Sequence, residues 1–521
     1  MKRSALLVIA LLLVTAVLYG CSNNNAGSDN NSGASASNES KAPDSASTEK
    51  KEKVKLKYYV PGSEKPDQKM VFDLVNKKLE ADGFNFEIEK VFIPSDAWDQ
   101  KINLMLSTGE DFDLFHVMQD RTPFTNYLNR GALADLTDSI NKYGANLKKA
   151  IPEDIFEGAQ VNGKTYVVPA YWVEMASEGE FDIRTDILKN NNLEMPKTPD
   201  ELLTAMDTVM KNWKGGTKPY LFGTANFDPV GFHTTVLHRT YDTFPFTIKD
   251  KFVYVNQNGD VKSWLETDEF KQDAAFMRKA YKMGVVNPDI LVVKKDQIKA
   301  QLDNGDWFVM FGSGGDLKSL QKNNPDATIN DIQAVYFNPE KPYLRPLTVK
   351  NANAVPITSK HVDEVVQFLD WMVASQENYD LVQYGIEGTH YEKDGDRGIK
   401  TILDPKDNSS RYAGSNSQIG NVNFVRLDQT NSIPSNNKVL YEPNTNAVNS
   451  IAANFVFDPT NVRAEYSNIT TEAEASITPI YMGVQDYDKA FPAALEKMKK
   501  AGLDKVIAEW QKQFKDYLAS K

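Results

Sequence analysis

Apolar and polar residues alternate over residues 54–60, and this spacing is typical of a β-strand with one buried face. Residues 70–79 then place apolar side chains at intervals of three and four, which predicts a helix. The succession repeats, with a second strand expected at 86–93, a helix at 98–106 and a third strand at 112–117. Strands that alternate with helices in this way predict an α/β sheet that contains parallel pairs.

The middle and the C-terminal parts of the chain continue the same pattern. Thr267 precedes an apolar stripe that stops at Gly284, so we expect a helix with a side-chain cap at its start. A further helix is predicted at about 361–374, and the last residues form two helical patterns interrupted at Ala501 and Gly502. We interpret these apolar stripes as core-facing sides of helices.

The first twenty residues are typical of an export signal. Lys2 and Arg3 precede an uncharged apolar stretch at the short edge of what can span a bilayer. Cys21, the only cysteine, directly follows the sequence LYG. This arrangement resembles the bacterial lipobox, in which the chain is cut before a cysteine that carries a diacylglycerol. We therefore expect residues 1–20 to be a lipoprotein signal peptide and Cys21 to be lipidated; an uncut anchor with an incidental cysteine is the alternative.

Residues 21–53 form a segment that we expect to be a disordered tether. The segment is rich in Gly, Ser and Asn and has almost no large apolar residue, so it cannot offset the entropy that ordering would cost. A lipid, a tether and a large body in this order predict a protein that works outside the cytoplasmic membrane while it stays attached to that membrane.

The body is long enough for more than one domain. The 521 residues include 41% hydrophobic and 25% charged residues, which is an ordinary globular composition. With 59 Lys and Arg against 71 Asp and Glu, the formal charge is −12, and no basic excess is present to neutralise phosphates, so we expect no nucleic-acid binding. A single cysteine excludes an intrachain disulfide and a cysteine-ligated metal cluster.

Short motifs that suggest enzyme chemistry lack the context that this chemistry needs. Residues 158–165, GAQVNGKT, fit the spacing of a phosphate-binding loop, but a β-branched and aromatic stretch stands where a helix should follow. A hairpin that turns at Asn162 and Gly163 is the better interpretation. His233 and His238 are five residues apart, which does not aim both side chains at one metal from a helix. The chain also has no G-x-S-x-G motif, the nucleophile signature of one large class of hydrolases.

Several segments, taken in order, resemble the carbohydrate-type extracellular solute-binding proteins of ABC importers, in their LipO-like lipoprotein branch. The segments that carry this resemblance are INLMLSTGEDFDLFHV at 102–117, YLNRGALADLTDSINKYG at 127–144, VNGKTYVVPA at 161–170, FDIRTDILKNNNLEMPKTPDEL at 181–202, MGVVNPD at 283–289 and YGIEGTHY at 384–391. The tail from FVFDP at 455–459 to EWQKQFKDYL at 509–518 is similar to the C-terminal region of that branch. The order of the motifs along residues 54–521 makes the resemblance specific.

The resemblance implies an α/β, two-lobe periplasmic-binding-protein-like fold (type II, venus-flytrap) with a hinge and central mixed sheets. Carrying over the family's chain crossings, we expect lobe one to comprise about 54–171 and 297–353, and lobe two about 172–296 and 354–521, including the C-terminal region. The ligand would bind in the cleft, and the closed complex would deliver it to an ABC permease in the membrane. We expect no cofactor, no resident metal and no catalytic residue, and we expect a monomer.

A sugar presents apolar C–H faces and a rim of hydroxyls, so it calls for aromatic platforms together with fixed donors and acceptors. Candidate ligand-binding residues of these types lie near strand ends and hinges. They are Tyr59, Gln119, Asp120, Tyr171, Trp172, Glu174, Phe227, Asp228, Trp307, Glu387, Asn421 and Phe424. For each of them a structural role is the alternative.

One departure from the family concerns calcium. The related alginate-binding proteins carry a calcium loop rich in Asp and Asn in lobe two. The corresponding stretch here, KNWKGGTKPY at 211–220, contains no carboxylate and so lacks the oxygen-rich cage that calcium needs. We expect no metal at this loop, and the departure weakens an alginate assignment in particular.

Three hypotheses from different classes follow. The leading one is a membrane-tethered lipoprotein that captures an oligosaccharide without altering it. The second is an extracellular carbohydrate-active enzyme, which would need two carboxylates roughly 5–10 Å apart across the sugar; Glu174 and Glu387 have the most suggestive neighbours among the 71 acidic residues. The third is a binding protein for peptides or another polar solute, whose cleft would be poor in aromatic platforms.

Overall fold

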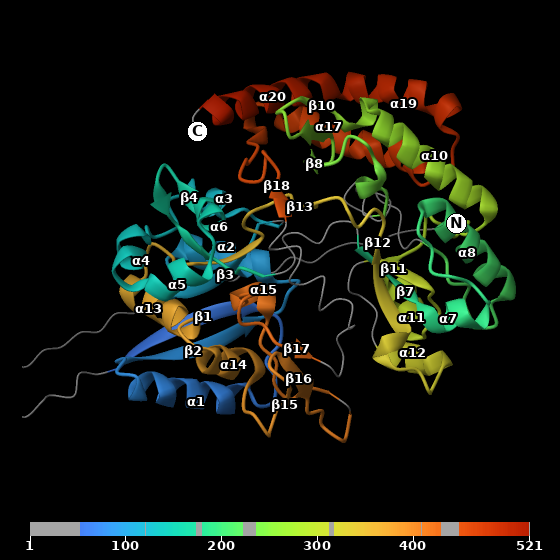
Figure 1. Ribbon diagram of the computed structural model, residues 1–521. Coiled ribbons are helices and arrows are strands. Elements are labelled where there is room, and N and C mark those ends of the chain that lie inside the picture. Colours follow the sequence, from blue (N-terminus) through green and yellow to red (C-terminus); the bar gives the residue numbers. More distant parts are fainter. Residues whose placement is uncertain are drawn as a thin grey trace, which may run out of the picture. The chain divides into compact units, whose positions relative to one another are not determined.

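Among the residues that the structure describes, five strands form the first sheet, in the order β2-β1-β3-β14-β6. Figure 1 labels β1, β2 and β3 of this sheet. The strands are β1 (Val54–Pro61), β2 (Phe86–Ile93), β3 (Leu114–Met118), β6 (Val167–Pro169) and β14 (Asn351–Ala354). β1 runs parallel to β2 and β3, whereas β14 runs antiparallel to β3 and β6, so the sheet is mixed. The computed structural model describes residues 53–119, 121–172, 180–221, 236–311, 317–407, 409–428 and 447–519.

Helices cover both faces of the first sheet. They are α1 (Gln68–Ala81), α13 (Val362–Met372) and α14 (Gln376–Tyr384) on one face, and α2 (Trp98–Thr108) and α3 (Phe124–Leu128) on the other, with α4 (Thr137–Tyr143), α5 (Ala145–Ala150) and α6 (Glu153–Glu157) packed at the side. The apolar side chains buried on these two faces, from residues 56–171 and 349–422, are called the first core below.

The elements expected from the spacing of apolar residues are confirmed in this part of the chain. The alternation at 54–60 buries Leu56, Tyr58 and Val60 against the helices, as expected of a strand with one core face. The predicted hairpin is also present, because β4 (Gln160–Val161) pairs antiparallel with β5 (Lys164–Thr165). Its turn residues Asn162 and Gly163 have φ of 51° and 74°. Such a turn favours Asn-Gly, which explains why this segment is no phosphate-binding loop.

A second, smaller sheet has the order β11-β7-β12. It consists of β7 (Glu180–Arg184) in the centre, with β11 (Val309–Phe311) and β12 (Ile332–Tyr336) antiparallel on either side. The elements packed with it are α7 (Thr185–Asn190), α8 (Pro199–Asn212), α10 (Asp268–Met283), α11 (Lys295–Asp303), α12 (Leu317–Asn323) and the meander β8 (Phe246–Lys249), β9 (Val253–Asn256) and β10 (Val261–Ser263). The predicted cap of α10 is confirmed: the Thr267 hydroxyl accepts from the Phe270 N–H at 3.1 Å.

The C-terminal helices complete the core around the second sheet. They are α17 (Arg463–Glu472), a π-helical turn (Ala473–Ile477), α18 (Thr478–Tyr481), α19 (Tyr487–Ala501) and α20 (Leu503–Ala519), and they lie along α10 and β10 (Figure 1). The expected break between the last two helices is confirmed at Gly502, which has φ of 113°. Apolar side chains from residues 181–337 and 452–514 form one buried cluster, called the second core below.

Three chain segments connect the two cores. The first leads from β6 to β7, and the second from β12 through β13 (Tyr343–Arg345) to β14. The third leads from the end of the first core to β18 (Ala447–Asn449). β13 and β18 pair in parallel, with Arg345 opposite Asn449, so the second and third segments are fastened to one another. A further small sheet, β15 (Tyr391–Asp394), β16 (Gly398–Thr401) and β17 (Leu427–Asp428), with α15 (Asn416–Ile419) nearby, belongs to the side of the first core.

The packing differs from the expected lobe boundaries in two places. Residues 297–353 were expected in lobe one, but β11 and β12 pair with β7 of the second sheet. Residues 354–428 were expected in lobe two, but α13 and α14 bury their apolar side chains in the first core. The pattern of a short strand or helix shows that it is buried but does not show which partner it packs against, because this choice depends on contacts far apart in the sequence. The expected signal peptide and tether lie outside the described residues.

Candidate ligand-binding site

The carboxyl ends of the parallel strands lie along one edge of the first sheet. β1, β2, β3 and β6 all run toward this edge, and β14 begins there. The chain leaves the same edge through the first connection to the second sheet, directly after β6. In open α/β sheets, ligands bind in the crevice beyond the carboxyl ends of the strands. We call this edge, with the residues that follow β1, β3 and β6, the strand-end site.

Trp172 and Tyr171 follow β6 at the strand-end site. Trp172 is half-buried, and its indole N–H is buried and has no acceptor among the described residues. Tyr171 is 6% exposed and packs in the first core, where its carbonyl accepts from the Val422 N–H at 2.7 Å. Burial raises the pKa of the Tyr171 hydroxyl, so it stays protonated at neutral pH. Of the two aromatic rings, Trp172 is the one that still has surface for a ligand.

Buried polar groups without partners gather close to the same edge. Among the described residues, neither amide atom of Gln68 has a hydrogen-bond partner, nor has Nδ1 of His116 or Oε1 of Gln418. Gln68 opens α1 after β1, His116 is the middle residue of β3, and Gln418 donates to the Pro61 carbonyl at 3.2 Å. Because buried polar groups are nearly always paired, such exceptions indicate where water or a ligand can complete the hydrogen bonds.

The charged state of these groups is set by burial. Burial lowers the pKa of His116 to about 4, the charge of Lys90 lowers it further, and hydrogen bonds with Asn351 and Ala352 oppose the shift. His116 is therefore neutral at pH 7. Burial also lowers the pKa of Lys90 to about 8. The ammonium group of Lys90 lies 5.8 Å from the ring centroid of Phe72 and 5.4 Å from that of Phe92. At pH 7 His116 is thus neutral, whereas Lys90 mostly keeps its positive charge.

Arg345 holds the connecting segments together beside this site. Its Nη1 donates to the side-chain oxygen of Asn449 at 2.6 Å and to the Asp154 carboxylate at 3.3 Å. Asn449 in turn donates to Asp154 at 2.8 Å, and the Arg345 carbonyl accepts from the Ser450 N–H at 2.9 Å. Arg345 is 4% exposed, whereas the side chain of Asp154 is 44% exposed, so only the Arg345 end of this group is shielded from water. No motif in the sequence marked Arg345, Gln68, His116 or Gln418, because their roles depend on neighbours that are distant along the chain.

Two of the residues predicted from the sequence have clear structural partners near the first sheet. Tyr59 lies in β1 on the opposite face from Tyr58 and packs edge-to-face on Phe112, with ring centroids 5.4 Å apart. Gln119 follows β3 at the strand-end site, but its side-chain oxygen accepts from the Phe124 N–H at 2.6 Å, at the start of α3. Gln119 therefore holds the loop at the site, whereas Tyr59 packs on the face of the sheet that α2 and α3 cover.

The remaining predicted residues that the structure describes are spread over both cores. Asn421 is 2% exposed and donates to the Ala150 carbonyl at 3.0 Å, and Phe424 stacks on Tyr379. Glu387 is exposed and pairs with Lys393 at 2.7 Å. Trp307 is 1% exposed beneath the second sheet, far along the chain from the strand ends. Cys21, Asp120, Glu174, Phe227 and Asp228 lie outside the described residues.

The loop that was compared with a calcium loop is held by hydrogen bonds. After α8 ends at Asn212, the backbone N–H groups of Gly216 and Thr217 donate to the two carboxylate oxygens of Asp306, at 3.1 Å and 3.0 Å. Within the described residues, no three His, Cys, Asp or Glu side chains lie close enough together to hold a metal ion.

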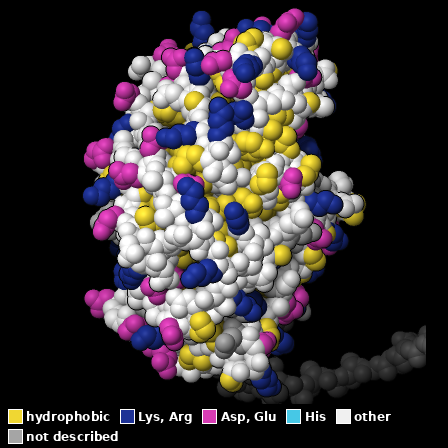
Figure 2. Space-filling view, turned by 90° about the vertical axis from the view of Figure 1, so that its right-hand side faces the viewer, with side chains coloured by type: hydrophobic (Ala, Val, Ile, Leu, Met, Phe, Trp, Pro, Cys, Tyr) yellow, Lys and Arg dark blue, Asp and Glu magenta, His cyan; other side chains and the backbone are white. Residues whose placement is uncertain are grey.

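The surface and the helices give two further observations. On the face shown in Figure 2, basic and acidic side chains are interspersed, with apolar side chains gathered between them. None of the helices in the described part of the chain combines the length and the apolar character needed to cross a membrane.

The chain is similar in sequence to known proteins. The chain is 26% identical to a carbohydrate ABC transporter substrate-binding protein of Streptococcus pneumoniae over 436 residues, which are 81% of this chain and 83% of the relative. It is 24% identical to lipoprotein LipO of Bacillus subtilis, covering 82% of this chain and 86% of that protein. Residues 451–519 match a domain of unknown function, DUF3502.

Solved structures share the fold. The N-glycan transport solute-binding protein NgtS of S. pneumoniae superposes with a TM-score of 0.70 at 20% identity, covering 90% of this chain and 99% of that chain. The ABC-transporter substrate-binding protein FusA of S. pneumoniae, in complex with kestose, gives a TM-score of 0.58 at 18% identity and covers 90% of this chain and 100% of that chain. The expected two-lobe fold is thereby confirmed. Residues 75–388, more than half of the sequence, match the bacterial extracellular solute-binding protein family, and the chain belongs to this family.

Proposed function

We propose that this chain is the substrate-binding component of an ABC transporter, and that it captures an oligosaccharide and delivers it to a permease in the membrane. The observation that carries the proposal is the strand-end site, where the indole of Trp172 lies at the same sheet edge as single buried polar atoms that have no partner among the described residues. These are both amide atoms of Gln68, Oε1 of Gln418 and Nδ1 of His116. An aromatic face together with unpaired donors and acceptors matches the apolar faces and the hydroxyls of a sugar. The names of the relatives, which are carbohydrate-binding components, support the same class of ligand.

Capture would depend on contacts with both lobes. A ligand shifts an equilibrium between open and closed forms only if it binds one form better, so it must touch groups from both sides of the hinge. The first lobe supplies the strand-end site. Arg345 and Asn449 bond the second and third connecting segments to one another, and both also bond to Asp154 of α6 in the first core. Rotation between the lobes therefore has to occur around a pair of fastened segments.

The finer parts of the proposal concern location and chemistry. The protein binds its ligand without making or breaking a bond, and it acts as a monomer on the outer face of the cytoplasmic membrane. It is held there by a lipid on Cys21 after removal of residues 1–20, and residues 21–53 are the tether. Within the predicted ligand set, Trp172 is the residue to which we assign stacking, with Glu174 close behind it along the chain.

A ligand screen tests the proposal. Thermal unfolding is measured with a panel of neutral and acidic oligosaccharides and with a mixture of short peptides as comparator. An oligosaccharide at 100 times its dissociation constant adds about 2.7 kcal/mol to the free energy of unfolding. Mass spectrometry after long incubation should recover the oligosaccharide intact. Stabilisation by peptides alone, or shortened saccharide products, would contradict the proposal.

Substitution of Trp172 tests the site itself. Trp172→Ala removes the stacking surface, so we expect a loss of oligosaccharide affinity of about tenfold, or roughly 1.4 kcal/mol. Trp172→Phe keeps an aromatic face and should retain most of the affinity, whereas neither change should move the unfolding midpoint of the free protein by much, because Trp172 is only half-buried. Isothermal titration calorimetry measures the affinity; equal affinities for both variants and the native chain would remove Trp172 from the site.

A further inference from the structure

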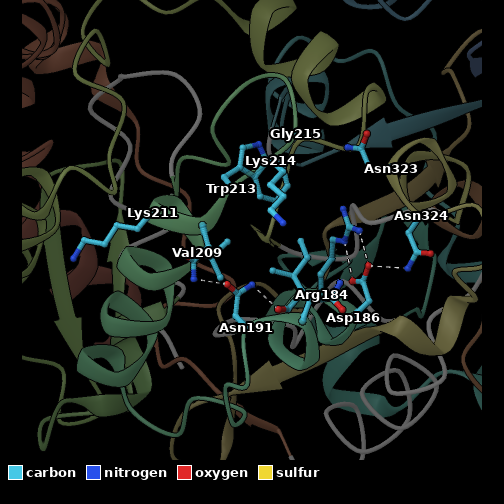
Figure 3. A pocket seen from close by; sticks show the side chains of 13 residues that line it. Arg184, Asp186, Asn191, Val209, Lys211, Trp213, Lys214, Gly215, Asn323 and Asn324 are labelled. Carbon is cyan, nitrogen blue, oxygen red and sulfur yellow. Dashed lines mark hydrogen bonds and ion pairs between the residues drawn. The ribbon is translucent and has the colours of Figure 1, made fainter.

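A polar cavity of about 1120 Å³ lies at the end of the second sheet opposite to the end at which β7 begins (Figure 3). β7 enters the sheet at Glu180, after the first connection, and ends at Arg184, which lines the cavity. Four residue steps at about 3.3 Å each separate these two ends by about 13 Å. The cavity is therefore distinct from the edge at which the connecting segments meet.

Asparagines dominate the lining of this cavity, which we call the asparagine cavity. The five asparagines are Asn190, Asn191, Asn212, Asn323 and Asn324. Each amide both donates and accepts, as a hydroxyl group does. Asn212 donates to Asn191 at 3.0 Å and Asn324 donates to Asp186 at 3.1 Å. Asn191 and Asn323 donate to the carbonyls of Ile187 and Asn304, at 2.9 Å and 3.1 Å. Most of the lining is thus fixed in place, and Asn190 together with the amide oxygens of Asn212, Asn323 and Asn324 remains for a ligand.

Helix α8 ends at the cavity without a cap. Its C-cap residue Trp213 has φ of −62° and ψ of 125°, and no backbone N–H among the described residues caps the last carbonyls of the helix. Uncapped helix ends leave up to four carbonyl oxygens free to accept. The indole N–H of Trp213 also has no acceptor among the described residues. The site thus offers free acceptors from the backbone next to an aromatic side chain.

The charges of the lining exclude strongly charged ligands. Arg184 binds both oxygens of Asp186, at 3.0 Å and 2.6 Å; although burial opposes it, this pairing, with Asn324, holds the pKa of Asp186 below its usual value. Lys211 pairs with Asp207, which leaves Lys214 as the lining cation that has no ion pair within the described residues. Figure 3 shows Lys214 extending toward the middle of the labelled side chains.

A neutral ligand fits this balance best. The carboxylate of Asp186 is already occupied, so a divalent cation would lack the charged oxygens it needs. A helix C-terminus disfavours an anion by about 0.3–1 kcal/mol, which is similar to what one exposed lysine contributes. Hydroxyl groups, in contrast, can donate to the free carbonyls and accept from Lys214 and from the amides.

The loop beyond α8 is organised in advance. Asp306 accepts from the backbone N–H groups of Gly216 and Thr217. A side chain at Gly215 would place its Cβ 2.7 Å from the indole of Trp213, so the close contact between the loop and the ring requires glycine. A preformed site loses less entropy on binding.

From these observations we infer that the asparagine cavity is a second saccharide-binding site, independent of the ligand cleft. It would hold a neutral sugar unit between the uncapped end of α8, the amides and Lys214. The inference rests on one part of the proposed function, namely that the protein is exposed to saccharides where it works. Two sites on one chain would raise the apparent affinity for a glycan polymer without any new contact in the cleft.

Fluorine NMR of the full chain, labelled with 5-fluorotryptophan in a sugar-free detergent, tests the inference. The chain has seven tryptophans, and Trp172→Phe and Trp213→Phe identify the two relevant signals. Sucrose, cellobiose and N-acetylglucosamine are titrated to about 10 mM, which saturates sites of millimolar affinity. We expect a saturable shift of the Trp213 signal that persists in Trp172→Ala. A response to sodium phosphate or calcium chloride but to no sugar, or a shift that disappears in Trp172→Ala, would overturn the inference.

A matched pair of lysine variants locates the second site. Lys214→Met removes a charged donor and should weaken the Trp213 response about tenfold. Lys189→Met removes the same charge from the neighbouring helix α7, where the side chain is exposed and near Asp331, and should change the response less than twofold, as is usual for exposed ion pairs at about 0–1 kcal/mol. Equal effects of both variants would contradict the assignment.

The outcomes for the two sites can be separated. A Trp172 signal that responds to an oligosaccharide while the Trp213 signal responds to none would leave the proposed function intact and overturn the second site. A Trp213 response without any ligand that moves the Trp172 signal would support the second site and count against the proposed function.

Discussion

The two cores of the protein are shielded from solvent by different elements. The first core surrounds a five-stranded sheet that is covered by helices on both faces. The second sheet has three short strands, and much of the surrounding apolar cluster comes from residues 452–514, beyond the third connection. A small sheet offers too little surface to bury a core by itself, so a helical layer from the end of the chain completes it. The segment that matches a domain of unknown function is therefore an integral part of the second core.

The largest expected effect concerns this dependence on the C-terminal helices. Trp510 is fully buried, and its indole N–H donates to the carboxylate of Asp250 at 2.8 Å. Burial raises the pKa of Asp250, while this hydrogen bond lowers it. Trp510→Ala creates a cavity and removes the donor, so we expect the free energy of unfolding of the second core to fall by about 3–5 kcal/mol. Urea unfolding followed by hydrogen exchange measures each core separately.

The control for this variant is Lys512→Ala on the same helix, where an exposed side chain should change stability by less than about 0.5 kcal/mol. Equal loss of protection from hydrogen exchange in both cores after Trp510→Ala would show that the two cores unfold as one unit. It would contradict a specific dependence of the second core on the C-terminal helices.

Arg345 lies in the second connecting segment, where a substitution should change how the two cores are coupled. Arg345→Met removes hydrogen bonds to Asn449 and Asp154 in a buried place, which should cost about 2–3 kcal/mol. Since these bonds link connecting segments, we expect the two cores to unfold more independently, with separate transitions in urea. Arg345→Lys keeps the charge but loses the forked geometry, and should fall between the native chain and Arg345→Met. A single, unshifted transition in Arg345→Met would argue against this role.

Acidification should change the stability of the two cores in opposite directions, because burial lowers the pKa of His116 in the first core and raises the pKa of Asp273 in the second. In the folded first core the pKa of His116 is about 4, below the usual 6.5, so the unfolded state binds the extra proton between these values. Stability from this group is present above pH 6.5 and falls by about 2 kcal/mol between pH 6.5 and pH 5. Burial raises the pKa of Asp273 in the second core to about 8, so its folded state holds the extra proton and gains stability as the pH falls.

Hydrogen exchange at pH 7 and pH 5 checks the two signs, with rates corrected for intrinsic exchange. His116→Gln should flatten the response of the first core, and Asp273→Asn that of the second. Parallel losses of protection in both cores on acidification would contradict the assignment of either group.

Two helix caps give the smallest effect and serve as local reporters. The Ser375 hydroxyl accepts from the Asn378 N–H at 3.1 Å at the start of α14 in the first core, and Thr267 caps α10 in the second core in the same manner. Each change to alanine should cost about 1 kcal/mol. We expect Ser375→Ala to lower only the transition of the first core and Thr267→Ala only that of the second. Effects on the opposite core would show that the transitions have been assigned to the wrong cores.

Local structure followed from the sequence alone. The alternation at 54–60, the cap at Thr267, the hairpin at Asn162 and Gly163 and the break at Gly502 all depend on neighbours within a few residues, and all are confirmed. The motifs taken in order also indicated the family and its two-lobe fold, which the comparisons confirm.

The candidate site was accessible to sequence reasoning only in part. Trp172 could be named because it follows a hinge proline, and the structure places it beyond a strand end. Trp307 carries the same kind of side chain, but it is buried and donates to Ser319 at 3.1 Å. An aromatic residue suits a core as well as a ligand, so the side chain alone does not distinguish these roles.

The sequence by itself determined where strands and helices form and which family the chain joins, because periodicity, caps and motif order are local or linear properties. Only the tertiary structure decided which sheet β11, β12 and α13 join, and that asparagines from three helices line one cavity. It also decided that single polar atoms of Gln68, His116 and Gln418 are buried without a partner among the described residues. These features depend on contacts between residues distant along the chain, and such contacts are made only when the cores pack.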